Sequence, residues 1–295
     1  MIDADPAVTI CGRSFSEGDI ERIRAVIEQD PPLCRSAIAR ATCETLGWRA
    51  ADGRIKAMSC RVALLRLARL GSIVLPPPRW GNGNGQPYRS AITIAEPETP
   101  VAPDLDLRRC VQVRPVQERK DSRLWNEAIH RFHYLGYRPL PGAQIRYLIE
   151  SDGSLLGAVG FSAAAWKVKP RDAWIGWSPS QREVRLNRVV NNARFLILPW
   201  VRIPHLASRV LALCARRIAS DMEQRYGTRP VLLETFVERD RFRGTCYQAA
   251  NWIYVGDTQG RGKLDRQHRH ELPVKHVYLY PLCREARAVL CSEAA

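Results

Sequence analysis

The stretch RFLILPWVRIPHLASRVLALCARRIASDMEQRYGTRPVLLETFV, residues 194–237, has a strand–helix–strand pattern. Its first eight residues are almost continuously apolar, which is typical of a strand buried on both faces. Pro204 then begins a helix that runs to about Tyr226 and ends at Gly227, with one apolar stripe and an arginine-rich outer face. The next strand follows at residues 230–237. Such a unit favours two parallel strands joined by a right-handed crossover.

Further strands and a helix flank this unit. Residues 144–150 and 155–163 are strand-like and meet at the turn Ser151-Asp152-Gly153-Ser154, which predicts an antiparallel hairpin. We therefore expect an α/β domain in which helices pack on a mixed sheet. The other predicted elements are a short helix and two strands, at residues 245–251, 252–255 and 276–280.

The N-terminal part is predicted to be helical. Ser16-Glu17-Gly18-Asp19 has the pattern of a helix start, and Ser36 can cap a second helix that ends at Gly47. A third helix is expected at about residues 56–70, and a short strand at 73–75 stops at three prolines. This is the element order of a winged helix-turn-helix, whose third helix can enter the major groove of DNA. The alternative is a small helical bundle that makes protein contacts.

The third predicted helix combines apolar and basic residues. Arg61, Arg66 and Arg69 lie off its apolar face, so these side chains are candidate contacts for duplex DNA. The residues expected on the apolar face are Met58, Val62, Leu64, Leu65, Leu67 and Ala68.

A linker is predicted between the two parts. Residues 96–103, EPETPVAP, are rich in proline and acidic residues and have no periodicity. The predicted domains are therefore a winged-helix-like domain at 1–95, a linker at 96–106 and an α/β domain at 107–295.

The positive charge lies mainly beyond residue 98. The chain has 45 Lys and Arg against 30 Asp and Glu, a net charge of +15. Residues 1–98 hold 13 basic and 11 acidic residues, a net of +2, and residues 99–295 hold 32 and 19, a net of +13. Such a field attracts polyanions, and nucleic acid is the usual partner of a strongly basic domain. Most of these residues are arginine, which binds phosphate bidentately, although an arginine-rich genome would also raise the arginine share.

The composition is that of a globular protein. With 45% hydrophobic and 25% charged residues, it excludes a disordered chain, a collagen and a coiled coil. Apolar runs such as residues 195–200 are too short to cross a bilayer, and the acidic N-terminus lacks a signal-peptide pattern. The nine cysteines form no C-x-x-C pair and favour free thiols. We therefore expect a cytoplasmic protein without a membrane partner.

Three carboxylates are candidate catalytic and metal-binding residues. Glu234 lies in an apolar strand, where an unpaired carboxylate is costly. Glu238 follows at the carboxyl end of that strand, and Asp172 lies after Arg171 and before two tryptophans. If these carboxylates converge, they suit a Mg²⁺ site for phosphodiester cleavage. The alternative is that Glu234 pairs with a buried arginine, such as Arg194.

His133 and Tyr134 are a second catalytic candidate. A histidine beside a tyrosine suits a general base and a phenol nucleophile, which would form a covalent protein–DNA intermediate. The alternative is a helix end packed by aromatic side chains.

A glycine-rich basic loop, GDTQGRGK at residues 256–263, is a third candidate site. Its backbone N–H groups could approach phosphates closely, but its spacing is not that of a Walker motif. The alternative is a solvated loop. The candidate nucleic-acid contacts in this part of the chain are Arg171, Arg194, Arg243, Arg261 and Lys263.

The predicted hairpin followed by strand–helix–strand–helix–strand resembles the core of GNAT acyltransferases. Residues 246–256 also resemble the late part of that core. The resemblance implies an acyl-CoA-dependent acyltransferase. A GNAT protein binds the cofactor pyrophosphate with a glycine-rich turn before its long helix, whereas the turn here, residues 201–208, has no glycine and contains Pro204.

A set of short motifs covers most of residues 110–283: HYLGY at 133–137, FSAAAW at 161–166, RDAWIGW at 171–177, NARFLILPW at 192–200, LETFV at 233–237 and GTCY at 244–247. Together they resemble the DruA family, which is named from the Druantia anti-phage system and has members in insertion sequences. The N-terminal run CRVALLRL at 60–67 resembles the longer, mobile-element-associated members. The resemblance implies a role in phage defence or DNA mobility and supplies no settled chemistry.

These observations lead to three hypotheses. The first is a two-domain DNA-processing enzyme that uses Mg²⁺ for cleavage or strand transfer, with duplex DNA on its N-terminal domain and a second, single-stranded stretch on its C-terminal domain. The second is a non-enzymatic DNA-binding adaptor that recruits other defence or transposition proteins. The third is an acyltransferase.

Overall fold

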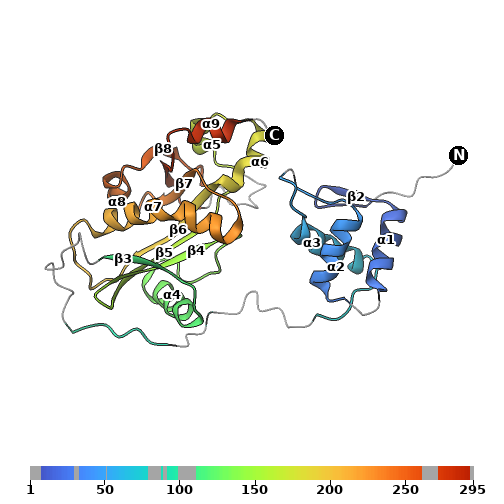
Figure 1. Cartoon of the computed structure of the whole chain (residues 1–295), viewed down its shortest axis with the longest axis horizontal. Coiled ribbons are helices and arrows are strands. Elements are labelled where there is room, and N and C mark those ends of the chain that lie inside the picture. The colour runs from blue at the N-terminus through green and yellow to red at the C-terminus, as the bar shows by residue number, and fades with distance from the viewer. Residues whose placement is uncertain are drawn as a thin grey trace. The chain divides into compact units, whose positions relative to one another are not determined.

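A computed structural model describes residues 8–29, 33–50, 52–78, 88, 92–98, 111–260 and 272–292. The chain divides into two compact units, Met1–Gln86 and Pro87–Ala295 (Figure 1). Of the predicted linker, residues 96–98 have no regular secondary structure and residues 99–106 lie outside the described part.

The N-terminal unit is a β-hairpin followed by three helices. Ser16 accepts a hydrogen bond from the Asp19 N–H and Asp19 accepts one from the Ser16 N–H, which confirms the predicted helix start. The second helix begins one residue after Cys34, so the predicted cap at Ser36 is wrong. The elements are β1 (Val8–Ile10), β2 (Arg13–Phe15), α1 (Glu17–Ile27), α2 (Arg35–Thr45) and α3 (Ala57–Arg69).

The strand predicted at residues 73–75 is absent, so a winged helix is not confirmed. Arginine side chains bind the carbonyls on both sides of this segment: Arg24 donates to the Ser72 carbonyl, and Arg35 donates to the Pro76 carbonyl over 2.6 Å. Three consecutive prolines then provide no N–H donors for a ladder. The only two-stranded sheet among the described residues of this unit, β1–β2, precedes the helices.

The buried face of α3 differs from the predicted one. Leu64 and Leu67 are buried as expected, together with Cys60 and Ala63, because this set repeats at helical spacing. The large apolar residues predicted in the core but found exposed are Met58, Val62 and Leu65. The basic residues predicted off the core face, and found exposed, are Arg61, Arg66 and Arg69.

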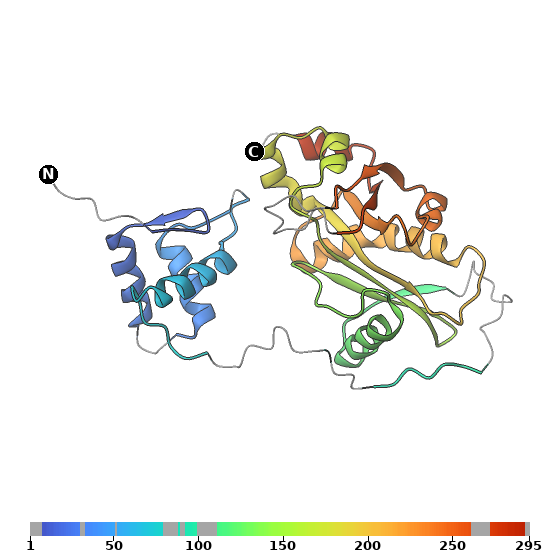
Figure 2. The same cartoon turned by 180° about the vertical axis from the view of Figure 1, so that it is seen from behind.

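The C-terminal unit has a mixed α/β fold around a seven-stranded sheet with strand order β3-β4-β5-β6-β7-β9-β8 (Figures 1 and 2). Only β6 and β7 pair in parallel; every other neighbouring pair is antiparallel. The strands are β3 (Gln112–Pro115), β4 (Ile145–Ser151), β5 (Ser154–Ala163), β6 (Val189–Ile197), β7 (Leu232–Glu238), β8 (Ile253–Asp257) and β9 (Lys275–Pro281). The helices are α4 (Arg119–Phe132), α5 (Lys169–Ile175), α6 (Pro179–Arg185), α7 (Leu206–Tyr226), α8 (Thr245–Ala249) and α9 (Ala286–Cys291), with a 3-10 turn at Leu186–Arg188.

Helices α4 and α7 cover opposite faces of the sheet. The Arg146 guanidinium lies over Trp125 of α4, whereas the Tyr147 hydroxyl donates to Asp221 of α7 over 2.7 Å. Because consecutive strand residues point to opposite faces, these neighbours in β4 assign one helix to each side. Figure 1 shows the long helix α7 lying across the sheet.

Most predicted elements of this unit are confirmed, with one shifted strand. The turn between β4 and β5 has positive φ at Asp152 (47°) and Gly153 (76°), as a two-residue hairpin requires. Gly227 ends α7 in the left-handed conformation. The strand predicted from Arg194 instead begins five residues earlier and ends before Pro199, which cannot donate to a ladder.

Candidate functional site

The two parallel strands of the sheet part at their carboxyl ends. Pairing between β6 and β7 runs from Val189–Leu232 to Asn192–Thr235 and then stops, although both strands continue. In the same region the pairing of β6 with β5 skips Ala193, which is a β-bulge. A cavity of about 480 Å³ lies where the strands part, a size typical of ligand sites.

The cavity lining is cationic. Arg194 comes from β6, Arg243 from the turn before α8 and Lys275 from β9, and no Asp or Glu is among the described lining residues. Arg194 donates to the Ala193 carbonyl over 2.7 Å and has no carboxylate partner in the described part of the chain. Burial lowers the pKa of its guanidinium, which marks a poorly solvated charge. An anionic ligand would supply the missing counter-charge.

His133 is neutral and presents a donor. The Leu135 N–H donates to His133 Nδ1 over 3.2 Å, so the neutral ring carries its proton on Nε2. Burial, and then the charge of Arg194, lowers the pKa of His133 to about 4. A ring in this tautomer donates a hydrogen bond rather than accepting a proton, so the geometry does not fit the predicted general base.

Tyr134 forms an aromatic wall of the cavity. Its ring stacks on His133 with centroids 4.9 Å apart and meets Phe242 edge-on at 5.2 Å, while the Arg241 guanidinium lies 4.8 Å from the ring centre. Burial raises the pKa of the Tyr134 phenol, which keeps it protonated and disfavours the predicted nucleophile. Since His133 directly follows α4, the pair fits the alternative of a helix end packed by aromatic side chains.

The floor of the cavity is held by a buried polar network. The Tyr247 hydroxyl donates to Asn192 Oδ1 over 2.7 Å, and Thr235 Oγ1 donates to the Asn192 carbonyl over 3.1 Å. These bonds fix α8 against the strands where β6 and β7 part. The sequence did not single out this network, because its three members come from three separate elements.

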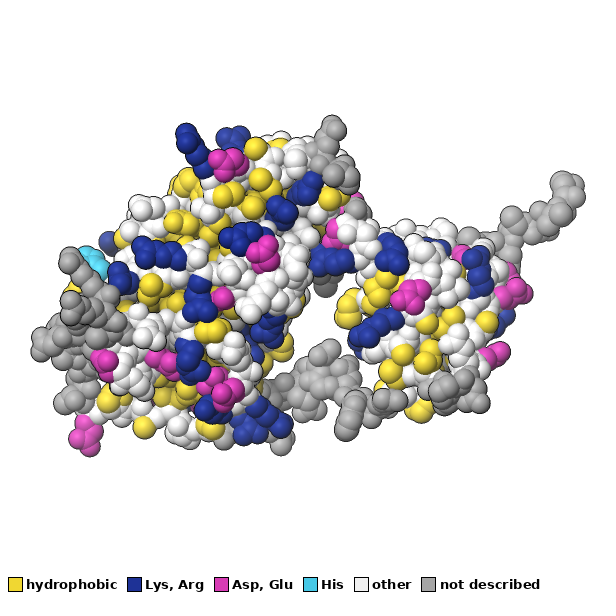
Figure 3. Space-filling view, in the orientation of Figure 1, with side chains coloured by type: hydrophobic (Ala, Val, Ile, Leu, Met, Phe, Trp, Pro, Cys, Tyr) yellow, Lys and Arg dark blue, Asp and Glu magenta, His cyan; other side chains and the backbone are white. Residues whose placement is uncertain are grey.

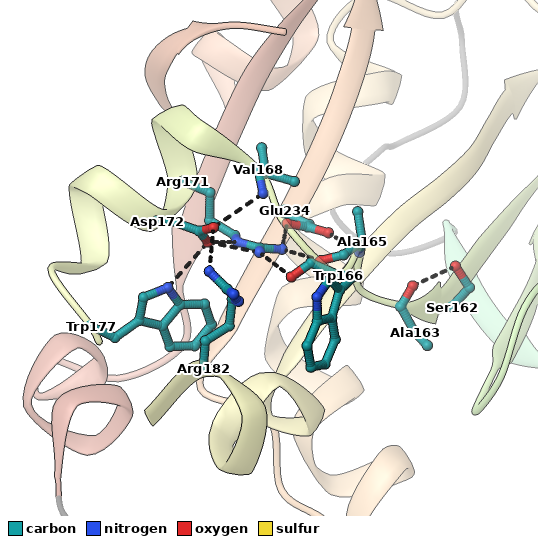
Figure 4. Close-up of polar contacts among 10 residues, drawn as sticks. All are labelled: Ser162, Ala163, Ala165, Trp166, Val168, Arg171, Asp172, Trp177, Arg182 and Glu234. Atoms are coloured by element: carbon teal, nitrogen blue, oxygen red, sulfur yellow. Dashed lines mark hydrogen bonds and ion pairs between the residues drawn. The ribbon is translucent and has the colours of Figure 1, made fainter. Parts of the chain in front are cut away.

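Glu234 belongs to a different cluster, drawn in Figure 4, and it points to the other face of the sheet. Its neighbour Thr235 bonds at the cavity, and consecutive strand residues point to opposite faces. Glu234 accepts hydrogen bonds from Arg171 Nη1 at 2.8 Å and from the Ala165 N–H at 2.9 Å. Arg171 also donates to Asp172 at 2.7 Å. Burial raises the pKa of Glu234, and the charge of Arg171 opposes that rise.

These carboxylates do not fit the predicted Mg²⁺ site. The Arg171 guanidinium lies between Asp172 and Glu234 and supplies the positive charge that a metal ion would supply. Glu238 lies near Tyr134 instead, where its charge adds to the burial that raises the pKa of the phenol, and the described residues contain no group of three or more potential metal ligands. The alternative that Glu234 pairs with a buried arginine is what the structure shows, with Arg171 rather than Arg194 as the partner.

The predicted nucleic-acid contacts of this unit differ in their surroundings. Arg171 is fully buried and cannot reach a ligand at the protein surface, so its prediction as a nucleic-acid contact is wrong. Arg194 and Arg243 line the cavity together with His133 and Tyr134. The other two predicted contacts, outside the described residues, are Arg261 and Lys263.

Phe242 is a site residue that the sequence prediction passed over. It lines the cavity and is 43% exposed, within the run RDRFRG at residues 239–244. Arginines alternating with an aromatic residue directly after a strand are a recognisable nucleic-acid signal.

None of the described helices is long and apolar enough to span a membrane.

Comparison with known proteins gives one family and a set of distant structures. The family described as Druantia protein DruA matches residues 93–269. The aminoglycoside acetyltransferase AAC(6')-Ib in complex with coenzyme A is 14% identical, with 62% of this chain and 99% of that chain covered and a TM-score of 0.40. A GNAT-family acetyltransferase from Streptococcus pneumoniae is 14% identical, with 58% and 98% covered and a TM-score of 0.37. An N-acetyltransferase from Staphylococcus aureus Mu50 is 15% identical, with 59% and 99% covered and a TM-score of 0.36. No curated protein matches the chain.

Proposed function

The chain belongs to the DruA family, which suggests a role in a defence system. We propose that it serves this role by binding nucleic acid, and that the cavity between β6 and β7 receives a phosphate-bearing part of the ligand. The bound state needs no metal ion, because arginine and lysine supply the positive charge.

The observation that carries the proposal is a cationic cavity with no Asp or Glu among its described lining residues. Arg194, Arg243 and Lys275 line it, and Arg194 has no counter-ion among the described residues. A half-buried cation is costly unless an anion offsets its lost hydration. Arginine offers phosphate a planar fork of donors. The cavity is therefore complementary to a phosphodiester in charge and in hydrogen bonding.

The net charge of the C-terminal part of the chain also favours nucleic acid as the partner. Residues 99–295 carry a net charge of +13, and Figure 3 shows Lys and Arg side chains spread over the visible face of the C-terminal unit. This long-range field would draw a polyanion to the unit, and the cavity would then bind it at a defined place. Binding without cleavage corresponds to the second hypothesis from the sequence, a non-enzymatic adaptor, and not to the first, a DNA-processing enzyme.

In this function Asp172, Glu234 and Glu238 take no part in metal-dependent cleavage. The first two are held by Arg171 on the face of the sheet opposite the cavity. Each oxygen of Glu234 accepts a hydrogen bond from a buried donor, and the charge of Arg171 already neutralises the carboxylate, so a metal ion would have to displace this ion pair.

The test is an affinity measurement with a fluorescein-labelled oligonucleotide and the full chain. Arg243→Ala is expected to weaken binding about fivefold or more and to lower the slope of log affinity against log salt by about one. The matched control is Arg216→Ala, which removes the same charge from an exposed position on α7 outside the cavity. Equal effects of the two substitutions would contradict a role for the cavity. The absence of binding by the unmodified chain in dilute buffer would contradict nucleic-acid binding altogether.

A second candidate function is acyl transfer from acyl-CoA. The observation that favours it is the position of the cavity between two parting parallel strands, where a cationic lining would also attract the phosphates of coenzyme A. Against it, α7 begins after a turn that has no glycine and includes Pro204, which lacks an N–H. Calorimetric titration with acetyl-CoA tests this function, and the absence of heat would contradict it.

A further inference from the structure

We propose that the turn at residues 239–243 binds an unpaired base of a single nucleic-acid strand, with the base stacked on the ring of Phe242. This inference rests on the proposed function and specifies its substrate: a single strand, or a nucleotide extruded from a duplex. In this inference Phe242 recognises the base of the ligand, whereas the cationic side chains recognise only its phosphates.

Phe242 combines exposure with a fixed position at the cavity. Its side chain is 43% exposed, yet it lines the cavity and meets the edge of Tyr134 at 5.2 Å. A single exposed apolar residue is common on protein surfaces. Here Phe242 lies between two exposed arginines in the sequence, Arg241 and Arg243, and its ring lines a cationic cavity. An aromatic face between two cations suits a base between two phosphates.

The backbone of the turn is held in place before any ligand binds. The Phe242 N–H donates to the Glu238 carbonyl at 2.9 Å, and the Arg239 N–H donates to the Val274 carbonyl at 3.1 Å. Gly244 ends the turn with φ of 70°, and its α-carbon lies so close to the Tyr278 ring that a Cβ would come within 2.6 Å of the Tyr278 hydroxyl oxygen. A fixed aromatic ring loses little conformational entropy when a base stacks on it.

The arginines on either side of Phe242 keep their charge available. Arg239 pairs with Asp240 at 3.3 Å and approaches Asp257 at 3.9 Å. Arg241 and Arg243 have no ion pair within the described part of the chain, and Arg241 lies against the Tyr134 ring instead. Two uncompensated arginines on either side of Phe242 in the sequence fit the alternation of phosphate and base along one strand.

The pairing state of the ligand follows from the stacking. In a duplex both faces of each base are covered by neighbouring bases, so the ring of Phe242 has no partner. An unpaired base exposes a face and gains by stacking on an aromatic side chain. Phe242 is therefore expected to favour single strands over duplexes, whereas the cations of the cavity serve both.

The test compares two labelled single strands that differ only in their bases: a mixed-sequence oligonucleotide and an abasic strand with the same number of phosphates. Binding is measured by fluorescence anisotropy with the full chain. Phe242→Ala is expected to weaken binding of the base-bearing strand on the order of tenfold and to leave binding of the abasic strand unchanged. Phe242→Trp keeps an aromatic face and is expected to restore the affinity. The matched control is Trp166→Ala, at a ring that is 57% exposed outside the cavity, and it is expected to have no effect.

The outcomes separate this inference from the proposed function. If Phe242→Ala binds the base-bearing strand as tightly as the unmodified chain while Arg243→Ala still weakens binding, stacking on Phe242 is wrong and nucleic-acid binding stands. Stacking at this turn would also be overturned if Phe242→Ala lowered the affinity for the base-bearing strand and for the abasic strand equally. The same holds if Trp166→Ala lowered the affinity for the base-bearing strand as much as Phe242→Ala does. If the unmodified chain binds neither strand, the proposed function itself fails.

Discussion

Arg171 donates a 2.8 Å hydrogen bond to Glu234 across 63 residues of sequence, and both side chains are fully buried. This ion pair ties α5 to β7, an interior strand of the sheet. It also explains why a carboxylate occurs in an apolar strand, since the carboxylate neutralises an arginine and accepts the Ala165 N–H as well.

The first prediction concerns the stability of this pair. Arg171→Met is expected to lower the free energy of unfolding by about 3 kcal/mol or more, because Glu234 is then buried without its partner. Urea denaturation followed by circular dichroism measures the change. Glu234→Gln should cost less, and its affinity for an oligonucleotide should stay within about twofold of the unmodified chain. A well-folded Glu234→Gln protein that no longer binds would place Glu234 in the functional site after all.

The second prediction is a pH dependence caused by His133. Its pKa in the folded protein is about 4, below the unfolded value of about 6.5. The unfolded state therefore binds more protons between these values, so stability is unaffected above pH ~6.5 and is lost as the pH falls towards 4. His133→Asn should show a smaller loss of unfolding free energy than the unmodified chain over this range. Urea denaturation at pH 7 and pH 4.5 measures it, and identical losses would contradict the burial of a neutral ring.

The third prediction concerns the glycine before α8. Gly244→Ala should lower the melting temperature and weaken oligonucleotide binding, because its φ is 70° and the added Cβ would clash with Tyr278. The matched control is Gly227→Ala, with φ of 68° and nothing within 4 Å of the added Cβ. The control should cost only about 1 kcal/mol and leave binding unchanged. Equal losses of stability would contradict the close approach to Tyr278.

The fourth prediction is that nucleic-acid binding does not need a divalent metal ion. Among the described residues the cavity lining has three cations and no carboxylate, so a chelator should leave the affinity unchanged at constant ionic strength. Anisotropy with and without EDTA measures this. A large loss with EDTA that Mg²⁺ restores would contradict charge neutralisation by Arg194, Arg243 and Lys275.

Local signals predicted most elements of the fold. Asp152-Gly153 identified the hairpin turn because both positions require positive φ, and Gly227 identified the end of α7 for the same reason. The shifted start of β6 was not predictable from apolarity, since the strand begins with two valines followed by two asparagines. The asparagines lie at a bulge beside the cavity, where polar residues are tolerated.

The N-terminal unit shows the limit of pattern recognition. Residues 73–75 have the composition of a strand, but arginines bind the flanking carbonyls and neither β1 nor β2 pairs with this segment. Apolarity also could not tell which side of α3 is buried, because Met58 and Val62 form an exposed stripe alongside the buried Cys60 and Leu64.

The candidate site could be predicted only residue by residue. His133, Arg194 and Arg243 were each named from the sequence, but their meeting in one cavity depends on the parting of β6 and β7. The carboxylates were named for the chemistry they could perform. The partner that neutralises Glu234 comes from α5, 63 residues earlier in the chain, and no spacing rule reveals that contact.

The most direct measurement is photochemical cross-linking of a single strand that carries 5-iodouracil, followed by mass spectrometry of the cross-linked peptides. If the cavity and its aromatic turn bind an unpaired base, the cross-links fall on Phe242 or Tyr134, and Phe242→Ala reduces them. Efficient cross-links confined to other parts of the chain, unchanged in Phe242→Ala, would contradict this assignment.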